Sequence, residues 1–118
     1  MEVRFYESVS GKIPVKEFLS RLLDIDQKRI EARIKAIRKY GLDAVGLEFR
    51  FIDSKLWEIK IRSVAGSYRL FYITFKNEIM VILHGYKKQS QKAPSRELKI
   101  AKQRMKEVFE NETSYCNS

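Results

Sequence analysis

Residues 56–84 constrain the fold most, because they contain three successive runs with the two-residue period of β-strands. In the first run, LWEIKIR, apolar side chains alternate with charged ones, namely Trp57, Ile59 and Ile61 with Glu58, Lys60 and Arg62. Successive side chains of a strand point to opposite faces, so one face of this run packs in a core, with Trp57 part of it, and the other presents cations. Turn segments at 63–67 and 76–78 then predict an antiparallel meander with strands at 56–62, 68–75 and 79–84.

Amphipathic helices are predicted on both sides of this meander. Pro14 suits the first turn of one helix, whose apolar stripe is Val15, Phe18, Leu19, Leu22 and Leu23. A second helix is expected to have Asp26 as its N-cap and to end at Gly41, with the stripe Ile30, Ile34, Ile37 and Tyr40. Ser95 is the expected N-cap of a third helix, whose apolar face is Leu98, Ala101, Met105, Val108 and Phe109.

The order of these elements indicates an α+β fold. A first strand at residues 3–6 precedes the two helices, and the apolar residues at 49–52 allow a further short strand. We expect a small antiparallel (mixed-edge) sheet with an N-terminal helical hairpin and a C-terminal helix. The helices should cover one sheet face and leave the other partly open. The 118 residues suffice for one domain, assigned to residues 1–110, with 111–118 as a flexible C-terminal tail.

The charge distribution narrows the class of partner. The formal net charge is +9, and residues 87–106 contain eight Lys or Arg and a single acid, Glu97. Such a concentration favours binding to nucleic acid or to an acidic protein. No apolar run approaches the roughly 20 residues that span a bilayer. The N-terminus has no signal-peptide core and Cys116 is the single cysteine, so we expect a cytoplasmic protein without a membrane partner.

The candidate catalytic residues lie on the charged side of the predicted sheet. One histidine and one cysteine exclude zinc sites built from several such residues, and no phosphate-binding glycine motif occurs, so we expect neither a metal nor a cofactor. An enzyme of this composition that acts on RNA would use the 2′-hydroxyl of the substrate as nucleophile, with a base beside it and cations on the phosphate. The residues of suitable type are Lys60, Arg62, Arg69, His84, Lys87 and Lys88.

The roles within that set are only partly assigned. Arginine binds phosphate in a bidentate manner and does not lose its proton, so Arg62 and Arg69 are interpreted as transition-state stabilisers. These cations are also able to form ion pairs with Glu48 or Glu58. His84 suits general acid or base catalysis, because the ordinary pKa of histidine is ~6.5, but a lone histidine at a strand end is as often structural.

Contacts to RNA or to the ribosome are expected from an aromatic residue and from the basic C-terminal part. An aromatic side chain can stack on an unpaired base. A row of lysines and arginines contributes charge that attracts the phosphate backbone. The residues concerned are Tyr86, Lys92, Arg96, Lys99 and Lys102.

The segments LWEIKIRSVAGSYRLFYIT and VILHGYKKQSQKAPSRELKIAKQR resemble the RelE/ParE superfamily of bacterial toxins, and within it the HigB-type, phage-derived branch. The resemblance implies a RelE-like fold and a metal-independent, ribosome-dependent mRNA endonuclease, which is an mRNA interferase. It puts Lys60 and Arg62 at the cationic strand positions of the RNA-cleaving members, and Arg69 at their phosphate-binding arginine. Lys87 and Lys88 match the basic pair after the last strand. Glu58 stands where RelE has a lysine, which makes His84 or a remaining lysine the candidate base.

The same resemblance implies the partners. Such toxins are held inactive by a HigA-like helix-turn-helix antitoxin, in a hetero-oligomer that binds operator DNA through the antitoxin, and they act on the ribosome and mRNA. A ParE-like toxin that inhibits DNA gyrase without cleaving RNA is the alternative within the superfamily. A basic RNA-binding module without catalytic activity is the alternative outside it.

Overall fold

A five-stranded sheet forms the centre of the protein, whose computed structural model describes residues 1–89 and 94–116. The strand order is β1-β5-β4-β3-β2; β1 runs parallel to β5 and the other neighbours are antiparallel. The strands are β1 (Glu2–Phe5), β2 (Glu48–Asp53), β3 (Leu56–Ser63), β4 (Gly66–Phe75) and β5 (Ile79–Lys88). The predicted α+β class, the meander and the mixed edge are therefore confirmed.

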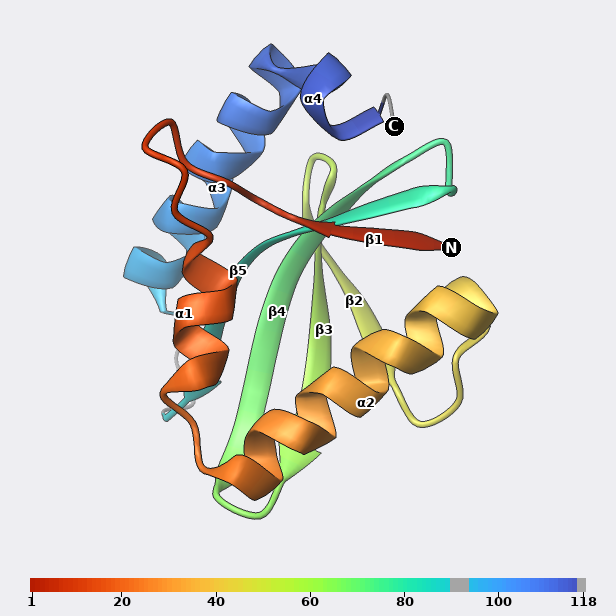
Figure 1. Cartoon of the computed structure of the whole chain (residues 1–118), viewed down its shortest axis with the longest axis vertical. Helices are drawn as coiled ribbons and strands as arrows, with labels where there is room; N and C mark the ends of the chain where they lie inside the picture. The colour runs from red at the N-terminus through yellow and green to blue at the C-terminus, as the bar shows by residue number, and fades with distance from the viewer. Residues whose placement is uncertain (90–93, 117–118) are drawn as a thin grey trace.

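Helices lie on both faces of this sheet (Figure 1). α1 (Pro14–Ser20) and α2 (Asp24–Tyr40), followed by the 3-10 helix η1 (Gly41–Asp43), lie on one face, which we call the α2 face. α3 (Ser95–Glu110), followed by α4 (Glu112–Cys116), lies on the other, the α3 face. The expectation that helices cover only one face was wrong. Figure 1 also shows α1 and α2 as an open V, each helix lying against the sheet.

Each face of the sheet has its own hydrophobic core, because both phases of the central strand β4 are apolar. On the α2 face the buried side chains include Tyr68, Leu70 and Tyr72 of β4, packed with Ile30, Ile34 and Ile37 of α2. On the α3 face they include Phe71 and Ile73 of β4, packed with Ala101 and Val108 of α3. Because helices cover both layers, a ligand can reach only the part of the α3 face that α3 leaves uncovered.

A glycine permits the close approach of α1 to β5. A Cβ atom at Gly85 would lie 2.9 Å from Cδ2 of Leu70 and 3.0 Å from the ring of Phe18. Cβ atoms in folded proteins do not approach other atoms this closely unless a neighbour shifts. A side chain at this position would therefore push α1 off the sheet. Gly41 serves a different purpose: with φ at 66° it ends α2, as predicted, and its N–H donates to the carbonyl of Ile37.

Asp26 has a different role from the predicted N-cap. α2 begins at Asp24, and Asp26 lies in its first turn with no exposed surface. Its carboxylate accepts hydrogen bonds from the hydroxyls of Ser63 and Tyr68, which ties α2 to β3 and β4. These bonds, with Ser63 the largest cause, hold the pKa of Asp26 below its ordinary value. Burial, followed by the bond to Asp26, raises the pKa of Tyr68 to about 12.

The predicted flexible tail is ordered over the part that the structure describes. Residues 112–116 form α4, and Tyr115 is only 9% exposed. The Tyr115 hydroxyl accepts a hydrogen bond from the N–H of Glu7 at 3.1 Å and donates to the carbonyl of Glu7 at 3.3 Å. The burial of one aromatic ring therefore attaches this end of the chain to the segment after β1, which sequence periodicity did not reveal.

Two further local expectations were wrong. Pro94, and not Ser95, is the N-cap of α3, and no side-chain hydrogen bond from residues 1–89 or 94–116 caps this helix. Trp57 is 37% exposed and lies outside the core, where its ring contacts Phe51 edge-to-face with the centroids 5.5 Å apart. The reason is its place at the start of β3, beyond the area that α2 covers.

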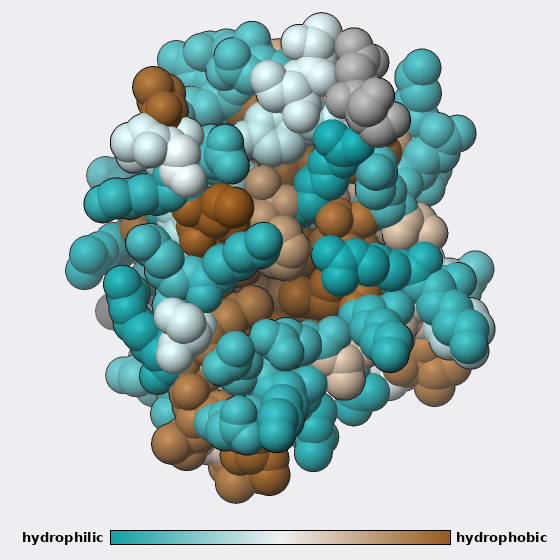
Figure 2. All heavy atoms as spheres, viewed as in Figure 1, coloured by the Kyte–Doolittle hydropathy of each residue, from teal (hydrophilic) through white to brown (hydrophobic). Residues whose placement is uncertain are grey.

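The surface around α1 and α2 is hydrophilic at its rim and hollowed at its centre, where apolar atoms are visible (Figure 2). This hollow is an open groove between the two helices, lined partly by Phe5, Leu19 and Ile34. Among the helices within residues 1–89 and 94–116, none has the length and apolar composition needed to cross a membrane.

Candidate functional site

Side chains, most of them polar, form three rows across the α3 face, and the pairing of the strands defines each row. The middle row consists of Glu48, Lys60, Arg69 and Tyr86, contributed in turn by β2, β3, β4 and β5. The row on one side of it consists of Arg50, Glu58, Phe71 and His84. The row on the other side consists of Arg62, Ser67 and Lys88. Directly opposite residues of paired strands lie ~5 Å apart, so these side chains share one patch.

A β-bulge in β5 decides which basic residues belong to that patch. Phe71 pairs with His84 whereas Tyr72 pairs with Ile82, so Leu83 is an extra residue in β5. After the bulge, His84, Tyr86 and Lys88 point to the α3 face. Lys87 pairs with Tyr68 and therefore points to the α2 face. The prediction that Lys87 joins the other cations was wrong for this reason.

A carboxylate and a guanidinium lie at the centre of the patch, both nearly buried. The side chains of Glu58 and Arg69 are 8% and 11% exposed, and Oε1 of Glu58 lies 3.6 Å from Nη1 of Arg69. The hydroxyl of Tyr86 donates to Oε2 of Glu58 at 3.4 Å. Burial, followed by the charge of Glu58, raises the pKa of Tyr86 to about 12, so this phenol stays protonated at neutral pH. Both contacts are longer than ordinary charge-assisted hydrogen bonds, which an entering anion could therefore displace.

Arg69 also has an unused donor. Its Nε atom is buried and has no hydrogen-bond partner among the residues that the structure describes. Buried donors in folded proteins are almost always paired, so an unpaired one calls for a ligand. A phosphate oxygen would satisfy a guanidinium donor at this place, because arginine binds phosphates through two N–H groups.

The cations around this centre are more exposed. Arg62 is exposed and, within residues 1–89 and 94–116, forms no hydrogen bond or ion pair. Nζ of Lys60 lies 3.9 Å from Glu48, and both side chains contact solvent, so this is a weak surface pair. A cavity of about 70 Å³ opens where the start of α3 meets the sheet; it is lined by Arg50, Ile52, Glu58, Phe71, Tyr86, Lys88, Pro94 and Leu98.

His84 is held between β5 and α3 by both of its ring nitrogens. Nη1 of Arg104 donates to Nδ1 of His84 at 3.1 Å and to the carbonyl of Leu83 at 3.0 Å. The ring proton is therefore on Nε2, which lies 3.3 Å from a carboxylate oxygen of Glu97. Burial is the largest cause that lowers the pKa of His84, so the ring is neutral at pH 7. Neither nitrogen is free to accept a proton from a substrate, which favours the structural interpretation of His84 over that of a base.

The predicted RNA-binding residues of the C-terminal part differ in their surroundings. Arg96 and Lys99 are exposed on the first turns of α3. Lys102 is 2.9 Å from Asp53 at the end of β2, and this ion pair lowers the pKa of Asp53. Lys92 lies outside the described residues. Arg96 and Lys99 therefore extend the cationic surface beside the cavity, while Lys102 connects α3 to the sheet.

Sequence reasoning missed three residues that shape this site. Arg50 shares the cavity with Glu58, and the alternation EFRFID in β2 could have assigned it to the same face as Lys60. Glu97 and Arg104 were seen only as charges on a helix. They are seven residues apart, two helical turns, so they lie on the flank that faces His84.

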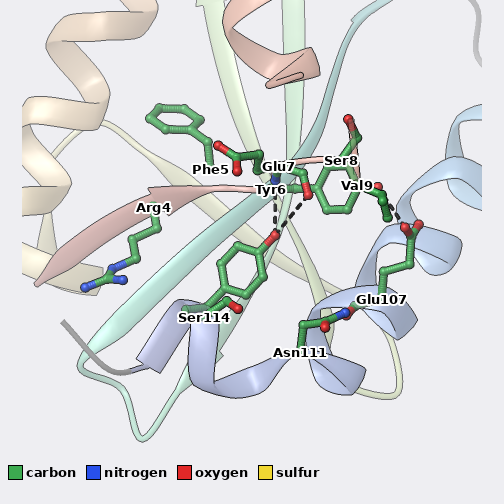
Figure 3. A pocket seen from close by; sticks show the side chains of 10 residues that line it. Arg4, Phe5, Tyr6, Glu7, Ser8, Val9, Glu107, Asn111 and Ser114 are labelled. Carbon is green, nitrogen blue, oxygen red and sulfur yellow. Dashed lines mark hydrogen bonds between the residues drawn. The ribbon is translucent and has the colours of Figure 1, made fainter. Parts of the chain in front are cut away.

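A larger cavity lies elsewhere, between the segment after β1, the end of α3 and α4 (Figure 3). Its volume is about 420 Å³, and its charged lining is Arg4, Glu7 and Glu107. Figure 3 shows Tyr6 directed at Glu107, to which its hydroxyl donates at 3.0 Å. This cavity has one cation against two carboxylates and does not suit a polyanion, so we assign the candidate site to the α3 face. No group of three or more His, Cys, Asp or Glu side chains that could hold a metal occurs within the described residues.

Comparison with protein-family models places the chain in a known family. A family model described as "Phage derived protein Gp49-like (DUF891)" matches residues 17–106. That range runs from α1 to α3 and includes every strand of the site. A search of curated proteins found no match.

Proposed function

The chain belongs to the phage-derived Gp49-like family, a family of RelE/ParE-like toxins, and we propose that it is a HigB-type toxin that cleaves mRNA on the ribosome. In this proposal the chain is the toxin of a type II toxin–antitoxin system, and a HigA-like antitoxin neutralises it. The activity is that of a metal-independent endoribonuclease. The α3 face is its active site.

One observation supports the proposal: nearly buried Arg69 has a donor without a partner among the described residues, beside the Glu58 carboxylate and surrounded by cations. Lys60, Arg62 and Lys88 surround this pair on the neighbouring rows. Such a set offers a phosphate several positive charges and offers the adjacent ribose a base. A low-dielectric setting strengthens each of these interactions relative to water.

The reaction follows from these groups. Glu58 removes the proton of the 2′-hydroxyl, and the 2′ oxygen attacks the adjacent phosphorus. The bond from phosphorus to the 5′ oxygen breaks, and that oxygen takes a proton from an N–H or O–H group of the same surface. The products are a 2′,3′-cyclic phosphate and a 5′-hydroxyl end. Arg69 and Arg62 stabilise the extra negative charge on the phosphate oxygens as the new bond forms.

The test is cleavage of mRNA bound to ribosomes by the purified protein. We expect fragments with 2′,3′-cyclic phosphate ends, in the presence of a chelator as well as in its absence. Arg62→Ala should strongly reduce cleavage but leave the free energy of unfolding within about 0.5 kcal/mol of the wild-type value, because Arg62 is exposed and has no partner among the described residues. Intact ribosome-bound mRNA in cells whose growth the protein has arrested would refute the proposal.

A ParE-like inhibitor of DNA gyrase is the second candidate. The observation that favours it is the burial of His84 and Arg69, since 13% and 11% of their side chains are exposed and each has internal partners. Under this alternative the Glu58–Arg69 pair is only structural. Inhibition of gyrase supercoiling by the wild-type protein, retained in Arg62→Ala, would support this candidate over the nuclease.

A further inference from the structure

The groove between α1 and α2 is an unassigned surface on the opposite side of the sheet from the candidate site. The open V of the two helices frames it, and β1 runs beside it (Figures 1 and 2). Its volume is about 700 Å³, larger than the cavity on the α3 face. Three apolar residues and five polar ones line it: Phe5, Leu19 and Ile34, and Lys16, Gln27, Glu31, Lys35 and Arg38.

The rim of this groove carries more positive than negative charge. Lys16, Lys35 and Arg38 face a single carboxylate, Glu31, which accepts a hydrogen bond from Gln27 at 3.1 Å. Nζ of Lys16 lies 5.6 Å from the centre of the Phe5 ring. Neither Lys16 nor Lys35 has an ion-pair partner within the part of the chain that the structure describes. An occupant with carboxylates at its edges would neutralise these amines.

Part of the sheet edge beside the groove is already used by α2. Nη2 of Arg38 donates to the carbonyl of Val3 at 3.4 Å, and the N-terminal amine donates to the carbonyl of Arg38 at 2.9 Å. These bonds lay the end of α2 over β1 and use a carbonyl that another strand would need. This favours an occupant that satisfies its own backbone hydrogen bonds, as a helix does.

We propose that this groove receives an amphipathic helix with an apolar stripe and acidic flanks, contributed by the partner that neutralises the toxin. The stripe would cover Phe5 and the apolar floor, and the acidic flanks would pair with Lys16 and Lys35. The inference rests on the proposed antitoxin, and it adds the place and the chemistry of its contact. A helix bound here leaves Arg69 on the α3 face uncovered.

The probe is a synthetic helix of about 18 residues, roughly 27 Å long, with leucines at i, i+3, i+4 and i+7 and glutamates beside them. Its binding to the full-length protein is measured by fluorescence anisotropy. We expect saturable binding that Lys35→Glu weakens about tenfold and that Glu31→Lys strengthens. Arg29→Glu is the matched control, because it changes the charge equally on the outer side of α2 and should leave the affinity unchanged.

A scrambled peptide of the same composition separates this proposal from simple attraction between opposite charges. Equal binding of the scrambled peptide, or equal loss of affinity in Arg29→Glu and Lys35→Glu, would overturn the proposal, as would the absence of binding. A dimer in sedimentation, in which a second copy of the chain covers the groove, would also overturn the proposal. No RNA or ribosome enters this experiment, so failure here leaves the nuclease proposal standing, and failure of mRNA cleavage leaves the peptide result intact.

Discussion

Arg69 lies 3.6 Å from Glu58 in the middle of the α3 face, and each is the charged partner that keeps the other stable in a nearly enclosed position. Removing one member of such a pair leaves an uncompensated charge, which costs more than the pair itself contributes. This relationship has consequences for stability that are separate from any role in catalysis.

We expect Arg69→Ala to lower the free energy of unfolding by about 3 kcal/mol, because it leaves the Glu58 carboxylate buried without its cation. Adding Glu58→Gln should recover part of that loss, since the double variant has no unpaired charge. Urea denaturation of the two single variants and the double variant gives the coupling energy. A single Arg69→Ala variant as stable as wild type would show that Glu58 does not depend on this guanidinium.

Lys87 and Lys88 are adjacent in sequence and lie on opposite faces of the sheet. Lys88→Ala should reduce mRNA cleavage by at least about tenfold, as expected for loss of a cation near the phosphate. Lys87→Ala should leave cleavage unchanged, and both variants should fold normally. Single-turnover rates with ribosome-bound mRNA compare the two. A larger effect of Lys87→Ala would contradict the assignment of the active site to the α3 face.

This pair also shows how far sequence reasoning extends. The alternation in LWEIKIR correctly predicted that Lys60 and Arg62 share a face, because β3 pairs with β4 without interruption. Alternation through β5 would instead have put Leu83 and Lys87 on one face. The bulge at Leu83 reverses the phase, and an apolar run carries no mark of an extra residue.

Hydrogen-bond partners that are distant in sequence could not be predicted from the sequence either. Asp26 was predicted to cap α2, whereas its carboxylate accepts hydrogen bonds from Ser63 and Tyr68, which come from another part of the chain. The sequence left His84 open between a catalytic acid or base and a structural residue, because its partners Glu97 and Arg104 are oriented by the packing of α3. Periodicity predicts which residues share an element or a face, whereas tertiary packing selects their partners.

The buried imidazole of His84 predicts a loss of stability in mild acid. Its pKa is lowered in the folded state, chiefly by burial, so the unfolded chain binds the proton more readily. The stabilisation is complete above the unfolded pKa of about 6.5 and is lost as pH falls from there through the folded value. Glu97 and Arg104 are the charged groups that face the ring, and their effects on its pKa oppose each other.

The measurement is the free energy of unfolding at pH 7 and pH 5, for wild type and for His84→Gln. We expect wild type to lose more stability than the variant over this interval, because only wild type has the imidazole whose pKa burial lowers. Parallel pH profiles of the two proteins would show that His84 is not the responsible group.

The hydroxyl of Tyr68 donates to Asp26 at 2.9 Å, on the α2 face of the sheet. Tyr68→Phe should therefore cost about 1 kcal/mol of stability without any change in mRNA cleavage. Tyr72→Phe is a matched control on the same strand and face, because the described residues provide no hydrogen bond for the Tyr72 hydroxyl. Thermal unfolding and a cleavage assay test both statements. Equal destabilisation by the two substitutions would mean that the bond to Asp26 contributes nothing specific.

Tyr115 anchors the C-terminal helix α4 by burying its ring beneath the segment after β1. Tyr115→Ala should lower the free energy of unfolding by about 2 kcal/mol, from lost apolar burial together with the two hydrogen bonds to Glu7. Tyr115→Phe should cost less than Tyr115→Ala, since it keeps the buried ring and loses only those bonds. Thr113→Ala, at an exposed position of α4, should stay within about 0.5 kcal/mol of wild type. Urea denaturation gives all three values, and a Tyr115→Ala variant as stable as Thr113→Ala would mean that α4 is dispensable for the fold.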